Sequence, residues 1–181
     1  VAAGTFACDV TISNCNNSGK LIWTYSQKPA GNAYNNLLMG GIVGYLEGQI
    51  SDCTNSGEIY AHGWRTTDTG SCYTKVVKIG GVAGVANKNV TNCTNAAGGN
   101  IDFSSTMTSG DLAAKYIGHS AYGTIGGVVA SSGSDSYIVS GCNNNAETMS
   151  LDMHMLPGNN SGASAGGVVG FVVGFSVDVG G

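Results

Sequence analysis

The pentapeptide Gly40-Gly41-Ile42-Val43-Gly44 decides the fold, because close copies of it recur along the chain. The other copies are Gly80-Gly81-Val82-Ala83-Gly84, Gly126-Gly127-Val128-Val129-Ala130 and Gly166-Gly167-Val168-Val169-Gly170. They follow one another at intervals of 40, 46 and 40 residues. A period of this length is typical of repeat proteins, in which each unit forms one supersecondary element and buries its apolar residues against the next unit.

A second motif recurs with the same period and combines an aliphatic residue, a cysteine and an asparagine at fixed spacing. Stacked units would place equivalent residues above one another, about 4.8 Å apart. The predicted structural columns are an aliphatic one (Ile12, Ile50, Val90 and Val139), a thiol one (Cys15, Cys53, Cys93 and Cys142) and an amide one (Asn17, Asn55, Asn95 and Asn144). We expect the asparagines at a bend, where the side chain tolerates a left-handed backbone and bonds the turn backbone or the asparagine of the next unit.

A third segment of each unit is apolar, at residues 20–23, 58–61, 100–103 and 149–155. In the last of these, Met149, Leu151 and Met153 alternate with polar residues, which is the pattern of a half-buried strand. Each unit is therefore read as three short strands followed by a linking loop, at residues 26–39, 63–79, 104–125 and 157–165. This pattern predicts an all-β parallel β-helix with a repeat of about 40 residues. An antiparallel sandwich is the competing fold, but it does not require one hexapeptide to recur.

The predicted β-helix has about four coils and occupies residues 1–181 as one solenoid domain. The expected coils cover approximately residues 1–39, 40–79, 80–125 and 126–165, with a partial coil at 166–181. Neither end resembles the polar cap that a solenoid needs. We therefore expect either a segment of a longer repeat protein or a chain that stacks end to end on itself or on neighbouring solenoid coils.

Composition excludes several classes of function. Charged residues make up 10% of the chain and the net charge is −4, which does not suit a nucleic-acid surface. No apolar run reaches the 18 residues or so of a membrane-spanning helix. The 6 cysteines form no CxxC pair and no His/Cys cluster with zinc spacing, so no metal or cofactor is expected. Cys8 and Cys72 lie outside the thiol column and are the favoured partners for a disulfide.

The Gly-Gly-Ile/Val-Val-Gly-Tyr block and the Ile-Ser-Asn/Asp-Cys-x-Asn-x-Gly block that follows it resemble the GLUG-type repeats of bacterial and protist surface proteins. The resemblance covers nearly the whole chain and is closest at residues 40–59 and then 80–101. The third unit departs from it, with Ala130 and Ala146 at glycine positions. The resemblance implies a right-handed parallel β-helix in a secreted or cell-surface protein, and it implies no catalytic residues.

The outer face of the third strand carries the candidate ligand-binding residues. Tyr60 and Trp64 are the aromatic side chains best placed to stack on sugar rings, and His62 lies between them. Thr24, His62, Ser104 and Asp152 would form one outer column, and Ile22, Tyr60, Asp102 and Ser150 the next. One aspartate in each column, with Arg65 as the single arginine, is a poor basis for catalysis, so we predict that the chain is not an enzyme.

Two further surface features carry weaker predictions. Hydroxyl and amide rows at Ser13, Ser51, Thr91 and Ser140, and at Asn16, Thr54, Thr94 and Asn143, are compatible with ice binding. Asn-x-Ser/Thr triplets make Asn16, Asn89, Asn92 and Asn159 candidate N-glycosylation sites.

The sequence favours a structural or adhesive solenoid module outside the cell that forms filaments by end-to-end stacking. The alternatives are a carbohydrate-binding or polysaccharide-degrading β-helix, and an ice-binding β-helix.

Overall fold

The chain was analysed as a computed structural model, which describes residues 10–24, 34–62, 73–105, 122–132, 138–153 and 162–171. All of the elements in these ranges are β-strands, and every strand pairing between them is parallel. The strands stack in five sheets of four strands each. The predicted all-β parallel β-helix is therefore confirmed, and its right-handed sense stays a prediction.

The five sheets are numbered here in chain order. Sheet I contains β1 (Thr11–Ser13), β6 (Gln49–Ser51), β11 (Val90–Thr91) and β16 (Val139–Ser140). Sheet II contains β2 (Asn16–Asn17), β7 (Thr54–Asn55), β12 (Thr94–Asn95) and β17 (Asn143–Asn144). Sheet III contains β3 (Leu21–Thr24), β8 (Ile59–His62), β13 (Ile101–Ser105) and β18 (Met149–Met153). Sheet IV contains β4 (Tyr34–Gly40), β9 (Tyr73–Gly80), β14 (Tyr122–Gly126) and β19 (Gly162–Gly166). Sheet V contains β5 (Val43–Leu46), β10 (Ala83–Ala86), β15 (Val129–Ser132) and β20 (Val169–Phe171).

Counted from β1, the described strands form four turns, and each turn passes once through all five sheets. The expectation of three strands per coil is too low, for two reasons. The Ile-x-x-Cys-x-Asn block is two strands, because the chain bends between β6 and β7. The ends of the predicted loops are strands as well, since β4, β9, β14 and β19 lie immediately before or at the glycine pairs.

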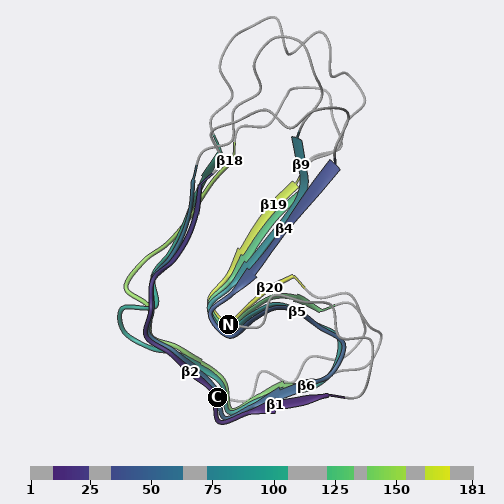
Figure 1. The fold of residues 1–181 in the computed structure, drawn as a ribbon, viewed down its shortest axis with the longest axis vertical. Helices are drawn as coiled ribbons and strands as arrows, with labels where there is room; N and C mark the ends of the chain where they lie inside the picture. The colour runs from purple at the N-terminus through teal and green to yellow at the C-terminus, as the bar shows by residue number, and fades with distance from the viewer. Residues whose placement is uncertain are drawn as a thin grey trace, which may run out of the picture.

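The core is divided between two pairs of facing sheets, as the view along the stack shows (Figure 1). One cluster lies between sheets I and V and contains Ile50, Cys53, Val82 and Val90, among others. The other lies between sheets III and IV and contains Ile59, Ile79, Ile101 and Phe103, among others. Because each strand is short and alternates its side chains, every turn adds one aliphatic layer to each cluster.

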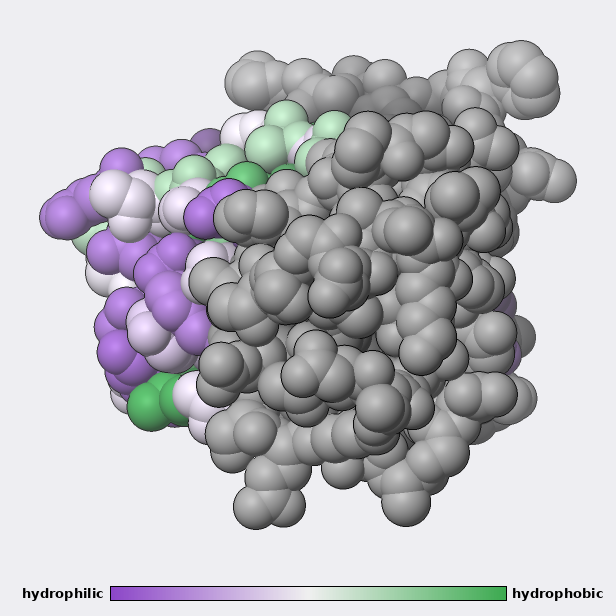
Figure 2. Space-filling view, turned by 90° about the horizontal axis from the view of Figure 1, so that it is seen from above, coloured by the Kyte–Doolittle hydropathy of each residue, from purple (hydrophilic) through white to green (hydrophobic). Residues whose placement is uncertain are grey.

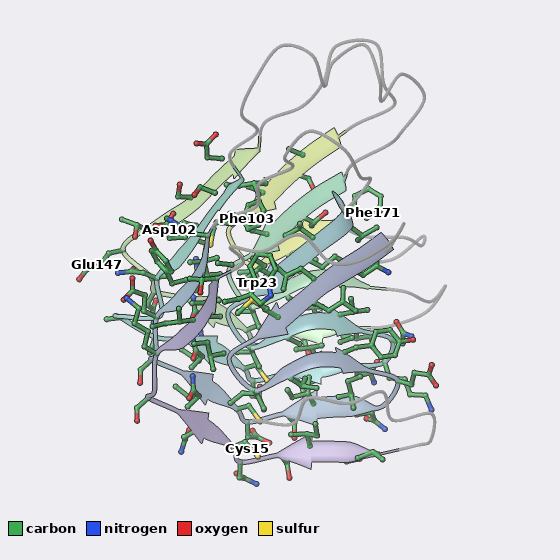
Figure 3. The ribbon with its side chains drawn as sticks, turned by 45° about the horizontal axis from the view of Figure 1, so that its top comes forward. Cys15, Trp23, Asp102, Phe103, Glu147 and Phe171 are labelled. Carbon is green, nitrogen blue, oxygen red and sulfur yellow. The ribbon has the colours of Figure 1, made fainter. Side chains whose placement is uncertain are left out.

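The inner column of sheet III shows how the layers fit together. Trp23 pairs in register with Ala61, Ala61 with Phe103, and Phe103 with Leu151. The small side chain of Ala61, which is fully buried, leaves room for the rings above and below it. Figure 3 shows Trp23 and Phe103 pointing into the molecule, whereas Asp102 lies on the outer side of the same sheet.

Candidate functional site

The amide column forms a continuous hydrogen-bonded ladder through all four turns. Nδ2 of Asn17 donates to Oδ1 of Asn55 at 2.8 Å. Nδ2 of Asn55 donates to Oδ1 of Asn95 at 2.9 Å, and Nδ2 of Asn95 donates to Oδ1 of Asn144 at 3.0 Å. The asparagines are brought together by the register of sheet II, in which each pairs with the asparagine of the next turn. All three bonds point the same way, so the ladder has a direction.

Each ladder amide also holds the turn that follows it. Nδ2 of Asn55 donates to the carbonyl oxygen of Gly57 at 2.9 Å, and the amide N–H of Gly57 donates back to Oδ1 of Asn55 at 3.3 Å. Together with its two ladder bonds, this fills the two donor and two acceptor positions of the side chain. Asn55 and Asn95 are fully buried. A buried polar group stabilises a fold only when it is satisfied, and here the satisfaction depends on both neighbouring turns.

The second glycine of the first three Gly-Gly pairs makes room for the ladder. A Cβ atom on Gly41 would collide with the side chain of Asn55 and with the carbonyl oxygen of Gly81. A Cβ on Gly81 would collide in the same way with Asn95 and with Gly127. At Gly167, the equivalent position in the fourth turn, a Cβ would meet nothing within 4 Å. The two recurring sequence motifs are therefore one packing unit, in which the glycine of one sheet accommodates the amide of another.

The thiol column lies beside the ladder, in the core between sheets I and V. Cys15, Cys53, Cys93 and Cys142 are all free thiols, and the first and last are half-buried whereas Cys53 and Cys93 are fully buried. The N–H of Cys15 donates to Sγ of Cys53, and the N–H of Cys93 donates to Sγ of Cys142, both at 3.4 Å. Cys8 and Cys72, the predicted disulfide partners, lie outside the described residues.

The environments of these thiols shift their pKa values in opposite directions. Burial raises the pKa of Cys53. The hydrogen bond between the side chains of Cys93 and Cys142 raises the pKa of Cys93 and lowers that of Cys142 to about 7. Cys142 is thus the thiol of this pair that ionises first, and it is also the more exposed one.

The left-handed backbone position of the repeat was missed by the sequence analysis. It falls not on the ladder asparagines but one residue before each cysteine, at Asn14 (φ 55°), Asp52 (φ 53°), Asn92 (φ 53°) and Gly141 (φ 60°). These residue types tolerate this conformation, which sets the corner between sheets I and II. The recurrence of asparagine, aspartate or glycine before every column cysteine was the available signal.

The outer face of sheet III holds the polar cluster that contains two of the predicted ligand-binding residues. The rings of Tyr60 and His62 stack with centroids 3.7 Å apart and an interplanar angle of 21°. Nε2 of His62 lies 2.9 Å from Oδ2 of Asp102 on the next strand, in a geometry too poorly aligned for a hydrogen bond. Nζ of Lys20 lies 2.9 Å from Oε2 of Glu58. The surface at this edge of the molecule is mainly hydrophilic (Figure 2).

Two of the chain's own side chains lie against the Tyr60 ring. His62 stacks on the ring, and Nζ of Lys20 lies 5.0 Å from the ring centroid. Lys20 comes from the strand position level with Glu58, two residues before Tyr60, whereas His62 comes two residues after it. A sugar ring stacking on Tyr60 would compete with these side chains for the ring. Trp64, the third predicted ligand-binding residue, lies outside the described residues.

The hydroxyl and amide rows lie on two different sheets. Ser13, Ser51, Thr91 and Ser140 align in sheet I, and Asn16, Thr54, Thr94 and Asn143 align in sheet II. The chain turns a corner between these sheets at the left-handed residue (Figure 1). The two rows therefore do not form one flat array.

The glycosylation triplets differ in their surroundings. Asn16 is exposed on β2. Oδ1 of Asn89, which directly precedes β11, accepts a hydrogen bond at 3.0 Å from the N–H of Ile138, which directly precedes β16, and this bond links neighbouring turns. Nδ2 of Asn92 donates to Oδ1 of Asp52 at 3.2 Å. Asn159 lies outside the described residues.

In the described ranges, no three His, Cys, Asp or Glu side chains are grouped so as to hold a metal ion. The described residues also contain no helix long and apolar enough to cross a membrane.

The family model of the GLUG motif matches residues 35–60. This segment runs from β4 through β8 and includes both Gly41 and Asn55, the two partners of the packing unit described above. The match is consistent with a GLUG-type repeat region. No curated protein and no solved structure matches the chain significantly.

Proposed function

We propose that this chain is a non-enzymatic structural or adhesive β-solenoid module of a secreted or cell-surface protein. The observation that carries the proposal is the asparagine ladder, which links all four turns and whose two inner amides, Asn55 and Asn95, are fully buried. Glycines, aliphatics, thiols and amides recur from turn to turn in the core. A repeated interior suits a rod that holds its shape, rather than a site that performs one reaction.

Low charge and the surface proteins that carry GLUG-type repeats support placement outside the cell. An antibody raised against the chain should label intact source cells or the culture medium, without permeabilisation. Labelling that requires permeabilised cells would contradict this part of the proposal. Carbohydrate binding, polysaccharide degradation and ice binding stay predictions from the sequence.

A structural role requires the stacked turns to resist separation under load, and single-molecule force spectroscopy measures this resistance. The test variant is Asn95→Ala, which removes the amide shared by the second, third and fourth turns. The matched control is Thr94→Ala, whose side chain lies next along the same strand on the outer face. We expect the wild-type chain to unfold at a high force, and we expect this force to fall clearly in Asn95→Ala and little in Thr94→Ala.

The expected difference follows from hydrogen bonding. Truncating Asn95 leaves Nδ2 of Asn55 and Oδ1 of Asn144 without their ladder partners, and each buried unsatisfied group costs about 1–3 kcal/mol. If the wild-type turns peel apart at forces typical of unstructured chains, or if the two variants behave alike, the ladder is not a mechanical element and the proposal fails.

A further inference from the structure

The ladder ends in unlike groups at the two ends of the described stack. Oδ1 of Asn55 accepts two hydrogen bonds, from Asn17 and from the N–H of Gly57. Among the described residues, Oδ1 of Asn17 accepts only the equivalent turn bond, from the N–H of Gly19 at 3.2 Å. The first turn therefore presents an amide acceptor that has room for one more donor.

The fourth turn presents the complementary donor. Nδ2 of Asn144 points to Sδ of Met149 at 3.6 Å, and a thioether is a weak acceptor. The equivalent atoms of Asn17, Asn55 and Asn95 each donate to the amide oxygen of the following turn. A donor at one end and an acceptor at the other make the stack complementary to a copy of itself in one orientation only.

The apolar residues at the two ends match in the same orientation. In the first turn, the inner side chains of Ile12, Cys15 and Leu21 are half-buried. Their equivalents in the second turn, Ile50, Cys53 and Ile59, are fully buried. In the fourth turn Cys142, Met149 and Leu151 are half-buried as well. Stacking the fourth turn on a first turn would place apolar residues on apolar residues, with Cys142 on Cys15, Met149 on Leu21 and Leu151 on Trp23. Stacked cysteines and stacked apolar residues already occur inside the stack.

We propose that a second copy of this chain stacks head to tail on the first, with its first turn against the fourth turn and with Asn144 donating across the contact to Asn17. This inference rests on the proposed structural function and names the partner and polarity of the assembly. The contact is heterologous, and repeating it along the stack axis gives an open filament rather than a closed ring or a dimer. It would also pair the outer edges of the first and last strands of each sheet, which have no partner among the described strands.

Asn144→Asp tests the contact selectively. An aspartate oxygen still accepts the hydrogen bonds that Asn144 receives from Asn95 at 3.0 Å and from the N–H of Ala146 at 3.3 Å. It loses the Nδ2 donor, and with it the weak bond to Sδ of Met149 at 3.6 Å, and it places a carboxylate against the acceptor of the next copy. The matched control is Asn143→Asp, the same change at the exposed neighbouring residue of β17.

Sedimentation velocity and negative-stain electron microscopy of the purified chain at increasing concentration measure the assembly. We expect rods that lengthen with concentration for the wild type and for Asn143→Asp, and loss of rods for Asn144→Asp. The variant keeps an intact first turn, so it binds to one end of a growing rod and blocks further addition. Substoichiometric Asn144→Asp should therefore shorten wild-type rods, whereas Asn143→Asp should not.

Two outcomes would overturn the inference. One is a wild-type chain that stays monomeric at every concentration, and the other is equal assembly of both variants, which would place the contact elsewhere. Circular dichroism melts of each variant show whether the fold is kept. A stable monomer with a high unfolding force would reject the stacking and leave the structural role intact, so the two proposals fail separately.

Discussion

Single glycines set tight limits in this molecule, because a Cβ at the second position of three of the four Gly-Gly pairs would collide with the amide ladder. The need is for space and not for an unusual backbone, since the left-handed positions lie elsewhere in the turn. A methyl group at this position would press on a buried amide that already has all its hydrogen bonds. The amide cannot move without breaking its ladder bonds.

Gly81→Ala and Gly167→Ala are a matched pair that tests this point. The first places a Cβ against Asn95 and the carbonyl oxygen of Gly127, and the second places it where no atom lies within 4 Å. Overpacking of a rigid site costs about 1–3 kcal/mol or more, so Gly81→Ala should lower the free energy of unfolding by at least this amount. Gly167→Ala should change it by less than about 0.5 kcal/mol. Urea denaturation measures both, and equal values would show that the glycines are not there to accommodate the ladder.

The thiol column gives a prediction about pH. The pKa of Cys142 is lowered to about 7 by its hydrogen bond with Cys93, so its thiolate forms well below the usual thiol pKa of about 8.5. Alkylation of Cys142 by iodoacetamide should rise through about pH 7. Cys53, whose pKa is raised by burial, and Cys93 should stay unmodified in the folded chain at the same pH. Peptide mapping by mass spectrometry identifies the modified residue.

The sign of the linked stability change is different for the two kinds of thiol. A lowered pKa stabilises the fold above the unfolded pKa, and this contribution is lost as pH falls through about 7 for Cys142. A raised pKa, as at Cys53, stabilises the fold below the unfolded pKa and is lost as pH rises through the folded value. An alkylation midpoint for Cys142 near 8.5, or equal modification of Cys53, would contradict the assignment.

Strands differ in how plainly the sequence shows them. The β6–β7 block is visible because three of its positions keep one residue type in every turn. The strands of sheet IV cannot be recognised in this way, because their inner residues change from turn to turn and share only their apolar character. Leu37, Val77 and Gly123 are register partners in this sheet, and no single-residue pattern connects them. The strands of sheet IV were therefore predicted as loops, although each strand ends at one of the recurring glycine pairs.

Side-chain placement within a strand was easier to predict than the contacts it makes. Alternation alone places Trp23 and Phe103 inside and Tyr60, His62 and Asp102 outside, because successive residues of a strand face opposite sides of a sheet. The stacking of His62 on Tyr60 and the position of Lys20 over the same ring depend on rotamers and on the register between strands. The repeat period of the sequence contains no information about rotamers, so the availability of Tyr60 to a ligand could not be predicted from the sequence.

The molecule as a whole behaves as a one-dimensional stack, because each strand pairs only with its equivalents in the turn before and the turn after. Stability in such a stack is approximately the sum of each turn's own stability and the contacts between neighbouring turns. Inner turns have two neighbours in the described stack, and the first and fourth have one. Local opening should therefore begin at the ends.

Asn17→Ala and Asn95→Ala separate an end effect from a central one. Both remove one ladder amide, but Asn17 bonds only the second turn, whereas Asn95 bonds both of its neighbours. We expect Asn17→Ala to speed hydrogen exchange in the first turn and to leave the amides of the third turn protected. Asn95→Ala should speed exchange on both sides of the third turn, including the N–H of Ile50, which bonds the carbonyl oxygen of Asn89, and that of Val90, which bonds Ile138. Hydrogen exchange with mass spectrometry resolves these segments. If both variants lost protection uniformly along the chain, the four turns would unfold as one unit, and an addition or loss of turns at the ends could not occur without unfolding the whole.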